Sequence, residues 1–256
     1  MADFEKTGRT TVVRKPDRGR HDRATVYAIL DEALICHVGI VEDGRPVVIP
    51  TAHWRDGDRL YLHCSRASRL LRAMGDGAEV CVTVTLLDGL VLARSGFHHS
   101  MNTRSVVIFG KADPVRGRAE KMAALRAFME RLAPGRWDEL RPPTDKEIAA
   151  TEIMVLPLVE ASAKVRTGGP PGGVPPIPYA GGAPATPGGP PGGVPPTPYA
   201  GGAPATPGGP VDAEADYAHP VWAGNWPIIQ SMGEPVPDAR LAPGIALPAY
   251  LRHGRG

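Results

Sequence analysis

Apolar side chains recur along the first two thirds of the chain in short runs, several of which alternate with polar residues as strands do. The runs cover residues 34–41, 46–54, 59–64, 79–85, 89–98, 103–115 and 153–159. Turn-forming sequences separate them, with EDG at 42–44, DGDR at 56–59 and LDG at 87–89. Strands joined by tight turns pair with antiparallel neighbours. The pattern therefore predicts a mainly β fold, either a barrel or a sandwich.

Helical spacing appears in three places. Asp22 can cap a helix that carries its apolar residues on one face, at Val26, Tyr27, Leu30, Ala33 and Leu34. A second, shorter helix is expected to begin with Ser65 as its N-cap and to end at Gly75. A third runs from Arg116 to Leu132, with Met122, Leu125, Met129 and Leu132 on its apolar face. These helices are expected to flank the strands, which makes the fold class α+β.

A tandem repeat interrupts the chain after residue 166. Two copies of GGPPGGVPPIPYAGGAPATP run from Gly168 to Pro207 and differ only where Thr197 replaces Ile177. Proline lacks a backbone donor and glycine is costly to order, so the repeat is expected to be a disordered linker. Its PPIP and PPTP tetrapeptides leave open a second interpretation, docking to an aromatic groove of a partner. The predicted organisation is a basic N-terminal arm (1–20), a barrel domain (21–166), the repeat insertion (167–210) and a C-terminal segment packing back on the barrel (211–256).

Charge and cysteine content limit the possible partners. The net charge is +2, which gives no general attraction to nucleic acid or to a membrane. The basic opening, Arg9 to Arg23, is interrupted by Asp17 and Asp22 and is interpreted as an exposed arm. Three cysteines without CxxC spacing and no apolar run of membrane-spanning length favour a reduced, cytoplasmic location.

Polar residues of possible chemical importance gather in two segments. At LHCSRASRLLRAMG (62–75), a strand runs into the short helix, and the hydroxyls of Ser65 and Ser68 lie near the guanidinium of Arg69. These are components of a phosphate site, although an ordinarily capped helix explains them equally well. The second segment, FHHSMNTRSVVIFG (97–110), contains His98, His99, Arg104 and Ser105. Adjacent histidines on a strand point to opposite faces, so no metal site is predicted.

Together these segments resemble a known family. The S-x-x-S-R helix start, LLDGLVLARSGFHHSMNTRSVVIFGKA, and KVRTGGP followed later by VWAGNWP are similar to the pyridoxamine 5′-phosphate oxidase-like flavin-nucleotide-binding proteins, which include the nitroimidazole-resistance group. The resemblance implies a six-stranded antiparallel split β-barrel, a homodimer, and FMN at the subunit interface. Where many relatives have tyrosine, this chain has Thr103.

The resemblance also implies site residues. It places the FMN phosphate against Ser65, Ser68 and Arg69, with Arg104 and Ser105 as further contacts. It places the backbone of Pro50, Thr51 and Ala52 at the pyrimidine edge of the flavin. The remaining expected site residues are Lys164 and Arg166 as positive charge near the flavin, Trp222 on its open face, and His53, His98 and His99 as proton donors.

The function expected from these residues is that of an FMN-dependent oxidoreductase acting on a small molecule, of nitroaromatic or aldehyde type. Three alternatives stay open at this point. The protein could bind or store flavin without catalysis, the same fold could hold haem or a deazaflavin, or the proline-rich repeats could make it an interaction protein.

Overall fold

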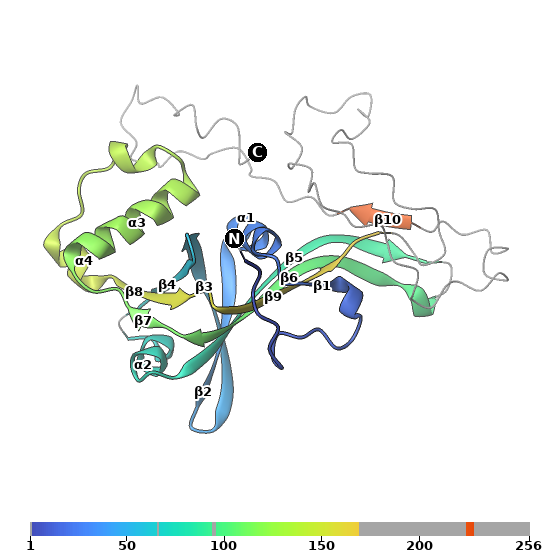
Figure 1. Cartoon of the computed structure of the whole chain (residues 1–256). Coiled ribbons are helices and arrows are strands. Elements are labelled where there is room, and N and C mark those ends of the chain that lie inside the picture. Colours follow the sequence, from blue (N-terminus) through green and yellow to red (C-terminus); the bar gives the residue numbers. More distant parts are fainter. Residues whose placement is uncertain (1, 66, 94–95, 169–223, 228–256) are drawn as a thin grey trace, which may run out of the picture. The chain divides into compact units, whose positions relative to one another are not determined.

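A computed structural model describes residues 2–65, 67–93, 96–168 and 224–227. Figure 1 shows the helices and strands of the chain. Contacts divide the chain into two units: unit 1 comprises residues 1–87 and 103–166, and unit 2 comprises residues 88–102 and 167–256. The strands are β1 (Gly19–Arg20), β2 (Ile35–Glu42), β3 (Arg45–Asp56), β4 (Arg59–Cys64), β5 (Glu79–Leu92), β6 (Ser100–Lys111), β7 (Asp113–Pro114), β8 (Glu152–Pro157), β9 (Glu160–Arg166) and β10 (Gly224–Pro227). The α-helices are α1 (Arg23–Glu32), α2 (Arg69–Gly75), α3 (Arg118–Leu132) and α4 (Asp145–Ala150), and the 3-10 helices are η1 (Pro16–Arg18), η2 (Gly96–His98) and η3 (Arg136–Glu139).

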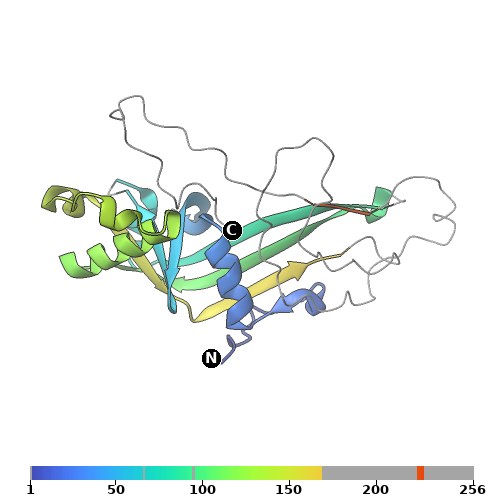
Figure 2. The same ribbon diagram turned by 90° about the horizontal axis from the view of Figure 1, so that it is seen from above.

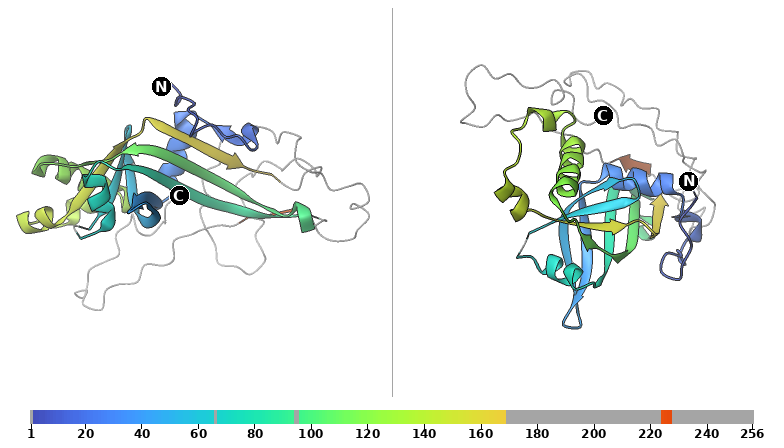
Figure 3. Two further views of the ribbon diagram at one scale, coloured as in Figure 1. Left: turned by 90° about the horizontal axis from the view of Figure 1, so that it is seen from below. Right: turned by 60° about the vertical axis from the view of Figure 1, so that its left-hand side comes forward.

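The strands of the described residues form one antiparallel sheet in the order β1-β9-β6-β5-β2-β3-β4-β8-β7. A single residue, Ala112, separates β6 from β7, and two residues separate β8 from β9. Because β6 pairs with β9 while β7 pairs with β8, each pair of segments behaves as one bent strand. The described residues form ten strands rather than the predicted six, because β6–β7 and β8–β9 are each divided by a bend and β1 and β10 are additional. The pairing of β4 with β8 closes the sheet into a barrel (Figure 3). The predicted class, mainly β with flanking helices, is confirmed.

Two tight hairpins confirm the predicted turns. Between β2 and β3, Asp43 and Gly44 have φ angles of 51° and 70°, as a primed turn requires. Between β3 and β4, Asp56 lies opposite Arg59, and Gly57 has a φ of 55°. The third predicted turn, at 87–89, is wrong, because β5 runs without a break from Glu79 to Leu92. Its glycine stays within the strand, where Gly89 pairs with Pro227 of β10.

The helices form where the sequence predicts them, with two differences in detail. Asp22 caps α1 as expected, and its carboxylate accepts from the Thr25 N–H at 2.8 Å. The predicted third helix is α3, but its packed face is rotated: Ala124, Leu125 and Phe128 contact the core, whereas Leu132 is 38% exposed. The start of α2 differs as well, as described below. None of the described helices is both long enough and apolar enough to cross a lipid bilayer.

Two clusters of buried side chains hold unit 1 together. The main core fills the barrel and includes Ile29 and Leu30 of α1, Leu70 and Met74 of α2, and the inward residues of the strands. A second cluster lies beneath α3, where the Trp54 ring stacks on Tyr61 at 5.5 Å and packs against Phe128 at 4.8 Å. Burial of these large apolar surfaces is the main stabilising contribution.

The N-terminal segment is not an exposed arm. Phe4 is 3% exposed and Thr10 is 1% exposed. The Phe4 N–H donates to the His21 carbonyl at 2.8 Å, and β1 adds to the edge of β9 (Figure 2). The N-terminal segment therefore lies against β9, because Thr7 and Arg9 donate to Glu160 and β1 pairs with Ala163 and Lys164, which charge alone does not indicate.

Unit 2 contains the extended ends of β5 and β6. Within it, Gly224–Pro227 pairs antiparallel with Gly89–Leu92, and the Asn102 side chain donates to the Gly168 carbonyl at 3.0 Å. The repeat after Gly168, Trp222, and the C-terminal segment other than residues 224–227 lie outside the described residues.

Candidate functional site

The start of α2 supplies the first group of expected site residues. Ser68, not Ser65, is the N-cap: its hydroxyl oxygen accepts from the Leu71 N–H at 3.1 Å. The Ser65 carbonyl accepts from the Ser68 N–H at 2.9 Å and closes a turn that redirects the chain after β4. The predicted N-cap at Ser65 is therefore wrong by three residues, because this turn must be completed before the helix can begin.

Arg69, at the start of α2, forms a solvent-exposed ion pair with a carboxylate. Its Nη1 lies 3.3 Å from Glu42 Oε2, and Arg72 Nη2 lies 3.8 Å from the other oxygen of the same carboxylate. Both arginines are more than half exposed, at 53% and 65%. Exposed pairs of this kind contribute little stability. Arg69 can therefore exchange Glu42 for an anionic ligand at small cost.

The facing strands β6 and β9 supply the second group. Ser105 lies opposite Lys164 and Thr103 lies opposite Arg166, so these four side chains share one face of the sheet. The Ser105 hydroxyl donates to the Lys164 carbonyl at 3.4 Å. Burial, with a smaller effect from the nearby Arg18 charge, lowers the pKa of Arg166. This face concentrates positive charge on the outside of the barrel.

Arg104 lies on the opposite face from Ser105, because consecutive strand residues alternate. Its guanidinium binds the carboxylate of Glu32, the last residue of α1, through two hydrogen bonds of 2.5 and 2.8 Å. The Arg104 side chain is only 15% exposed. Arg104 thus connects α1 to β6, and the sequence neighbours Arg104 and Ser105 do not act on one ligand from the same side.

The third group lies on β3. Pro50 is opposite His37 and Ala52 is opposite Ile35, on the outer face of the β2–β3 hairpin. Thr51 points the other way, and its hydroxyl donates to the His63 carbonyl at 2.7 Å. Pro50 and Ala52 therefore border an exposed apolar surface, whereas Thr51 fastens β3 to the end of β4.

The three expected proton donors occupy different environments. His53 is fully buried, and its Nε2 donates to the Leu30 carbonyl at 3.0 Å. Burial, reinforced by the Arg131 charge, lowers the pKa of His53 to about 4. This is the environment of a structural histidine that stays neutral. His98 ends η2 in unit 2, with its ring 5.5 Å from that of Phe97, and the adjacent His99 is exposed.

The expected site residues thus lie in separate parts of the described structure. Among the described residues, no hydrogen bond or ion pair joins the start of α2 to the β6–β9 face. Within the same part of the chain, no group of three His, Cys, Asp or Glu side chains is placed to hold a metal ion. Burial raises the pKa of the Cys36 and Cys64 thiols to about 12, so neither thiol is a nucleophile at neutral pH.

One feature near the second group is absent from the sequence expectations. Residues 9–14 lie over β6 and β9 and enclose a hollow of about 250 Å³ against Ser105 and Lys164. The predicted strands end at residue 159 and do not include β9, although Ala161, Ala163 and Val165 alternate with polar residues, which is a weak strand signal. Extending the strand pattern past residue 159 would have brought the lysine and its neighbours to this face.

The whole barrel is similar to known proteins. Residues 22–165 match the family model for pyridoxamine 5′-phosphate oxidase. Among solved structures, a flavocytochrome from Azotobacter vinelandii is 38% identical, with a TM-score of 0.75 over 96% of this chain and 95% of that one. A FAD- and haem-binding protein from Mycobacterium smegmatis is 31% identical, with a TM-score of 0.73 over 92% and 96% of the two chains.

A more distant structure shares the fold. A proposed 5-nitroimidazole antibiotic resistance protein from Bacteroides thetaiotaomicron is 24% identical, with a TM-score of 0.50 over 57% of this chain and 86% of that one. No curated protein sequence gives a significant match.

Proposed function

Since the chain belongs to the pyridoxamine 5′-phosphate oxidase family, we propose that it is a flavin-binding protein that carries out redox chemistry on a small molecule. The observation that carries the proposal is the likeness to a flavocytochrome, which is 38% identical and extends over 96% of the chain. Similarity of that extent includes the segments beyond the barrel as well as the barrel itself.

The residues present fit a flavin nucleotide. An isoalloxazine ring needs a flat apolar surface and backbone groups at its edge, and β3 offers both around Pro50 and Ala52. A phosphate needs hydroxyls and cations, which Ser65, Ser68 and Arg69 supply at the start of α2. The proposed cofactor is FMN held in this way. FAD is the alternative, because the mycobacterial relative binds it.

The bound flavin would supply the redox chemistry by accepting and donating electrons at its ring. The chain's own residues bind and orient it: Arg69 and Ser68 hold the phosphate, and the apolar β3 surface excludes water from the ring. Of the histidines proposed as proton donors, His99 is exposed and His98 is half-buried. His53 would have to leave the core before it could reach a substrate, so it is the weakest of the three.

A homodimer is the proposed assembly. Alternate residues of β2 and β3 place Ile35, Val41 and Val48 on the outer face of the hairpin, where they are 51%, 66% and 63% exposed. An apolar sheet face of this kind is stabilised when a second copy covers it. The same face carries Pro50 and Ala52, so the flavin would lie at the subunit interface.

Haem is the second proposed cofactor. Two similar structures favour it, since one is a flavocytochrome and the other binds haem together with FAD. Reconstitution with haem and with each flavin, read by absorption, distinguishes the two proposals. A haem spectrum without flavin would replace the first proposal by the second, and spectra of both would support both.

Variants at the start of α2 test the phosphate contacts. Replacing Arg69→Gln removes a charged donor, so we expect flavin affinity to fall by about tenfold or more. Arg72→Gln is the matched control, because Arg72 lies on the same helix, pairs with the same Glu42 and is 65% exposed. Flavin titration followed by fluorescence measures both. Equal affinities of the two variants would remove Arg69 from the proposed site.

A further inference from the structure

The hollow beneath the N-terminal segment has the size and position of a small ligand site. Residues 9–14 form one wall, and the outer faces of β6 and β9 form the other. Ser105 lies opposite Lys164 and Val107 lies opposite Ser162, so these four side chains form a continuous floor. Pockets for whole drug-sized ligands measure about 300–1,000 Å³. A hollow of about 250 Å³ therefore suits a small group better than a flavin ring.

The charge of its lining has one sign. Arg9, Arg14 and Lys164 all border the hollow, and none of the lining residues is acidic. Arg9 is compensated by the carboxylates of Glu79 and Glu160. Among the described residues, neither Arg14 nor Lys164 forms an ion pair. Two uncompensated cations at one small hollow attract an anion.

Ser162 adds a hydroxyl to the floor of the hollow. The residue is 7% exposed, and within the described part of the chain no hydrogen bond is formed by its hydroxyl. Because Ser162 lines the hollow beside Lys164, a ligand oxygen there would satisfy it. The Ser105 hydroxyl, whose bond to the Lys164 carbonyl is long at 3.4 Å, is available as a second donor.

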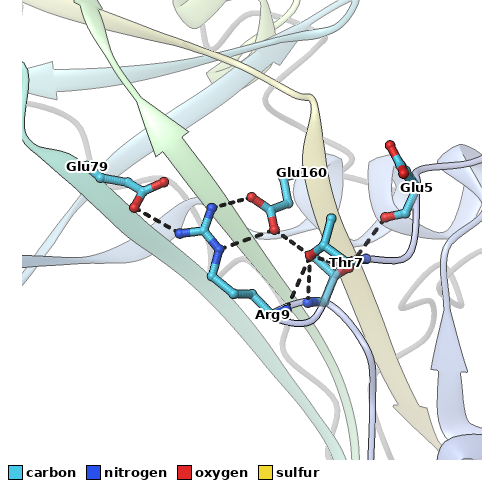
Figure 4. A network of polar contacts seen from close by, with 6 residues as sticks. Glu5, Thr7, Arg9, Glu79 and Glu160 are labelled. Carbon is cyan, nitrogen blue, oxygen red and sulfur yellow. Dashed lines mark hydrogen bonds and ion pairs between the residues drawn. The ribbon is translucent and has the colours of Figure 1, made fainter.

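The wall formed by the N-terminal segment is held in place before any ligand arrives. Figure 4 shows the contacts that hold it: Thr7 and Arg9 donate to the Glu160 carboxylate, and Arg9 Nη1 lies 2.9 Å from Glu79 Oε2. The Arg9 guanidinium lies 4.7 Å from the centre of the Phe109 ring. A site whose walls are already ordered loses less entropy when it binds.

We propose that this hollow binds a phosphate or diphosphate group, with Lys164 and Arg14 supplying charge and Ser162 and Ser105 supplying hydroxyl donors. The inference goes beyond the flavin phosphate assigned to α2. The group could come from two sources that share this chemistry. One is the diphosphate of a flavin dinucleotide, whose flavin phosphate would then lie here and not at the start of α2. The other is a separate phosphorylated substrate or electron donor.

Titration of the full-length protein with inorganic pyrophosphate, followed by calorimetry, tests the proposal. Lys164→Met should weaken binding by at least about tenfold, since it removes a charge-assisted hydrogen bond. Ser162→Ala should weaken it several-fold with little change of shape. Lys111→Met is the control, because Lys111 is an exposed lysine at the end of β6 outside the hollow. Circular dichroism verifies folding, and if Lys164→Met does not fold, Ser162→Ala carries the test.

The proposal is overturned if the wild type does not bind pyrophosphate, or if it and all three variants bind it equally. Repeating the titration after loading with FMN or FAD separates the two sources. Loss of pyrophosphate binding with FAD but not with FMN identifies the dinucleotide tail, whereas retention with both identifies a separate ligand. Flavin binding is read by absorbance in the same samples, so its failure would contradict the proposed function without altering the pyrophosphate result.

Discussion

His53 gives a titratable group to the barrel core. Its Nε2 donates to the Leu30 carbonyl, while its Nδ1 is buried and has no hydrogen-bond partner among the residues that the structure describes. The pKa of His53 is about 4 in the folded protein, against 6.5 ordinarily. Between these values the unfolded chain binds a proton that the folded protein does not. The contribution of neutral His53 to the free energy of unfolding is therefore fully present above about pH 6.5. It is lost as the pH falls toward 4, by an amount on the order of 3 kcal/mol.

The variant His53→Leu should flatten this pH dependence. Denaturant unfolding between about pH 7 and pH 4.5 would measure the difference. His63→Gln is the control, since His63 is exposed on the neighbouring strand. Parallel pH curves for wild type and His53→Leu would show that His53 does not set the acid sensitivity.

A second prediction at the residue scale concerns the contribution of Arg131 to stability. From α3, its Nη2 donates to the Leu30 carbonyl at 2.8 Å and also to the Ala33 carbonyl, so it caps the end of α1. The side chain is 11% exposed. Arg131→Met should lower the free energy of unfolding by about 1–3 kcal/mol, because the cap is lost. Arg126→Met, at a site 54% exposed on the same helix, should change it by less than about 0.5 kcal/mol. Equal losses in thermal unfolding would contradict this role.

Local sequence signals predicted those elements whose partners are near in the chain. Asp22 caps α1 because Thr25 is three residues away, and the hairpin at Asp43 and Gly44 needs only its own backbone. The N-cap of α2 was missed because Ser65 and Ser68 fit the same rule, and the turn after β4 decides between them. The strand β9 was missed because small alanines carry its inward face, with little apolar signal.

Contacts between distant elements were beyond the sequence. Thr7 and Arg9 meet Glu160 across more than 150 residues, and nothing in the basic run indicates that partner. The same holds for the hollow, whose walls come from the N-terminal segment, β6 and β9. The chemistry at Ser68 and Arg69 was recognisable because it lies within one short segment. Conversely, that Arg104 and Ser105 point to opposite faces of the sheet becomes clear only once the pairing register of β6 is known.

At the scale of the whole molecule, the exposed apolar face of β2 and β3 predicts a dimer that charge should disrupt. Val48→Asp places a carboxylate in the proposed interface, where it would lose its hydration, so the variant should be monomeric. Val159→Asp is the matched control, because Val159 is 71% exposed outside that hairpin. Light scattering on a sizing column gives the mass of each. A dimeric Val48→Asp variant would move the interface elsewhere.

Deletion of Gly168 to Pro207 tests the role of the tandem repeat. The entropy cost of closing a loop grows only with the logarithm of its length, so the shortened protein should keep its flavin and its assembly. Flavin content and mass in solution measure both. Loss of flavin on deletion would mean that the repeat contributes to the site, and loss of a cellular partner alone would favour the docking interpretation of its PPIP and PPTP sequences.

The central claim, that this barrel is a flavin-binding member of its family, has one direct test. It is the absorption spectrum of the full-length protein, purified and then incubated with FMN or FAD, with the cofactor released afterwards and identified by chromatography. The account predicts the bands of oxidised flavin, retained through desalting and present in proportion to protein. A protein that stays colourless and retains neither flavin would contradict it.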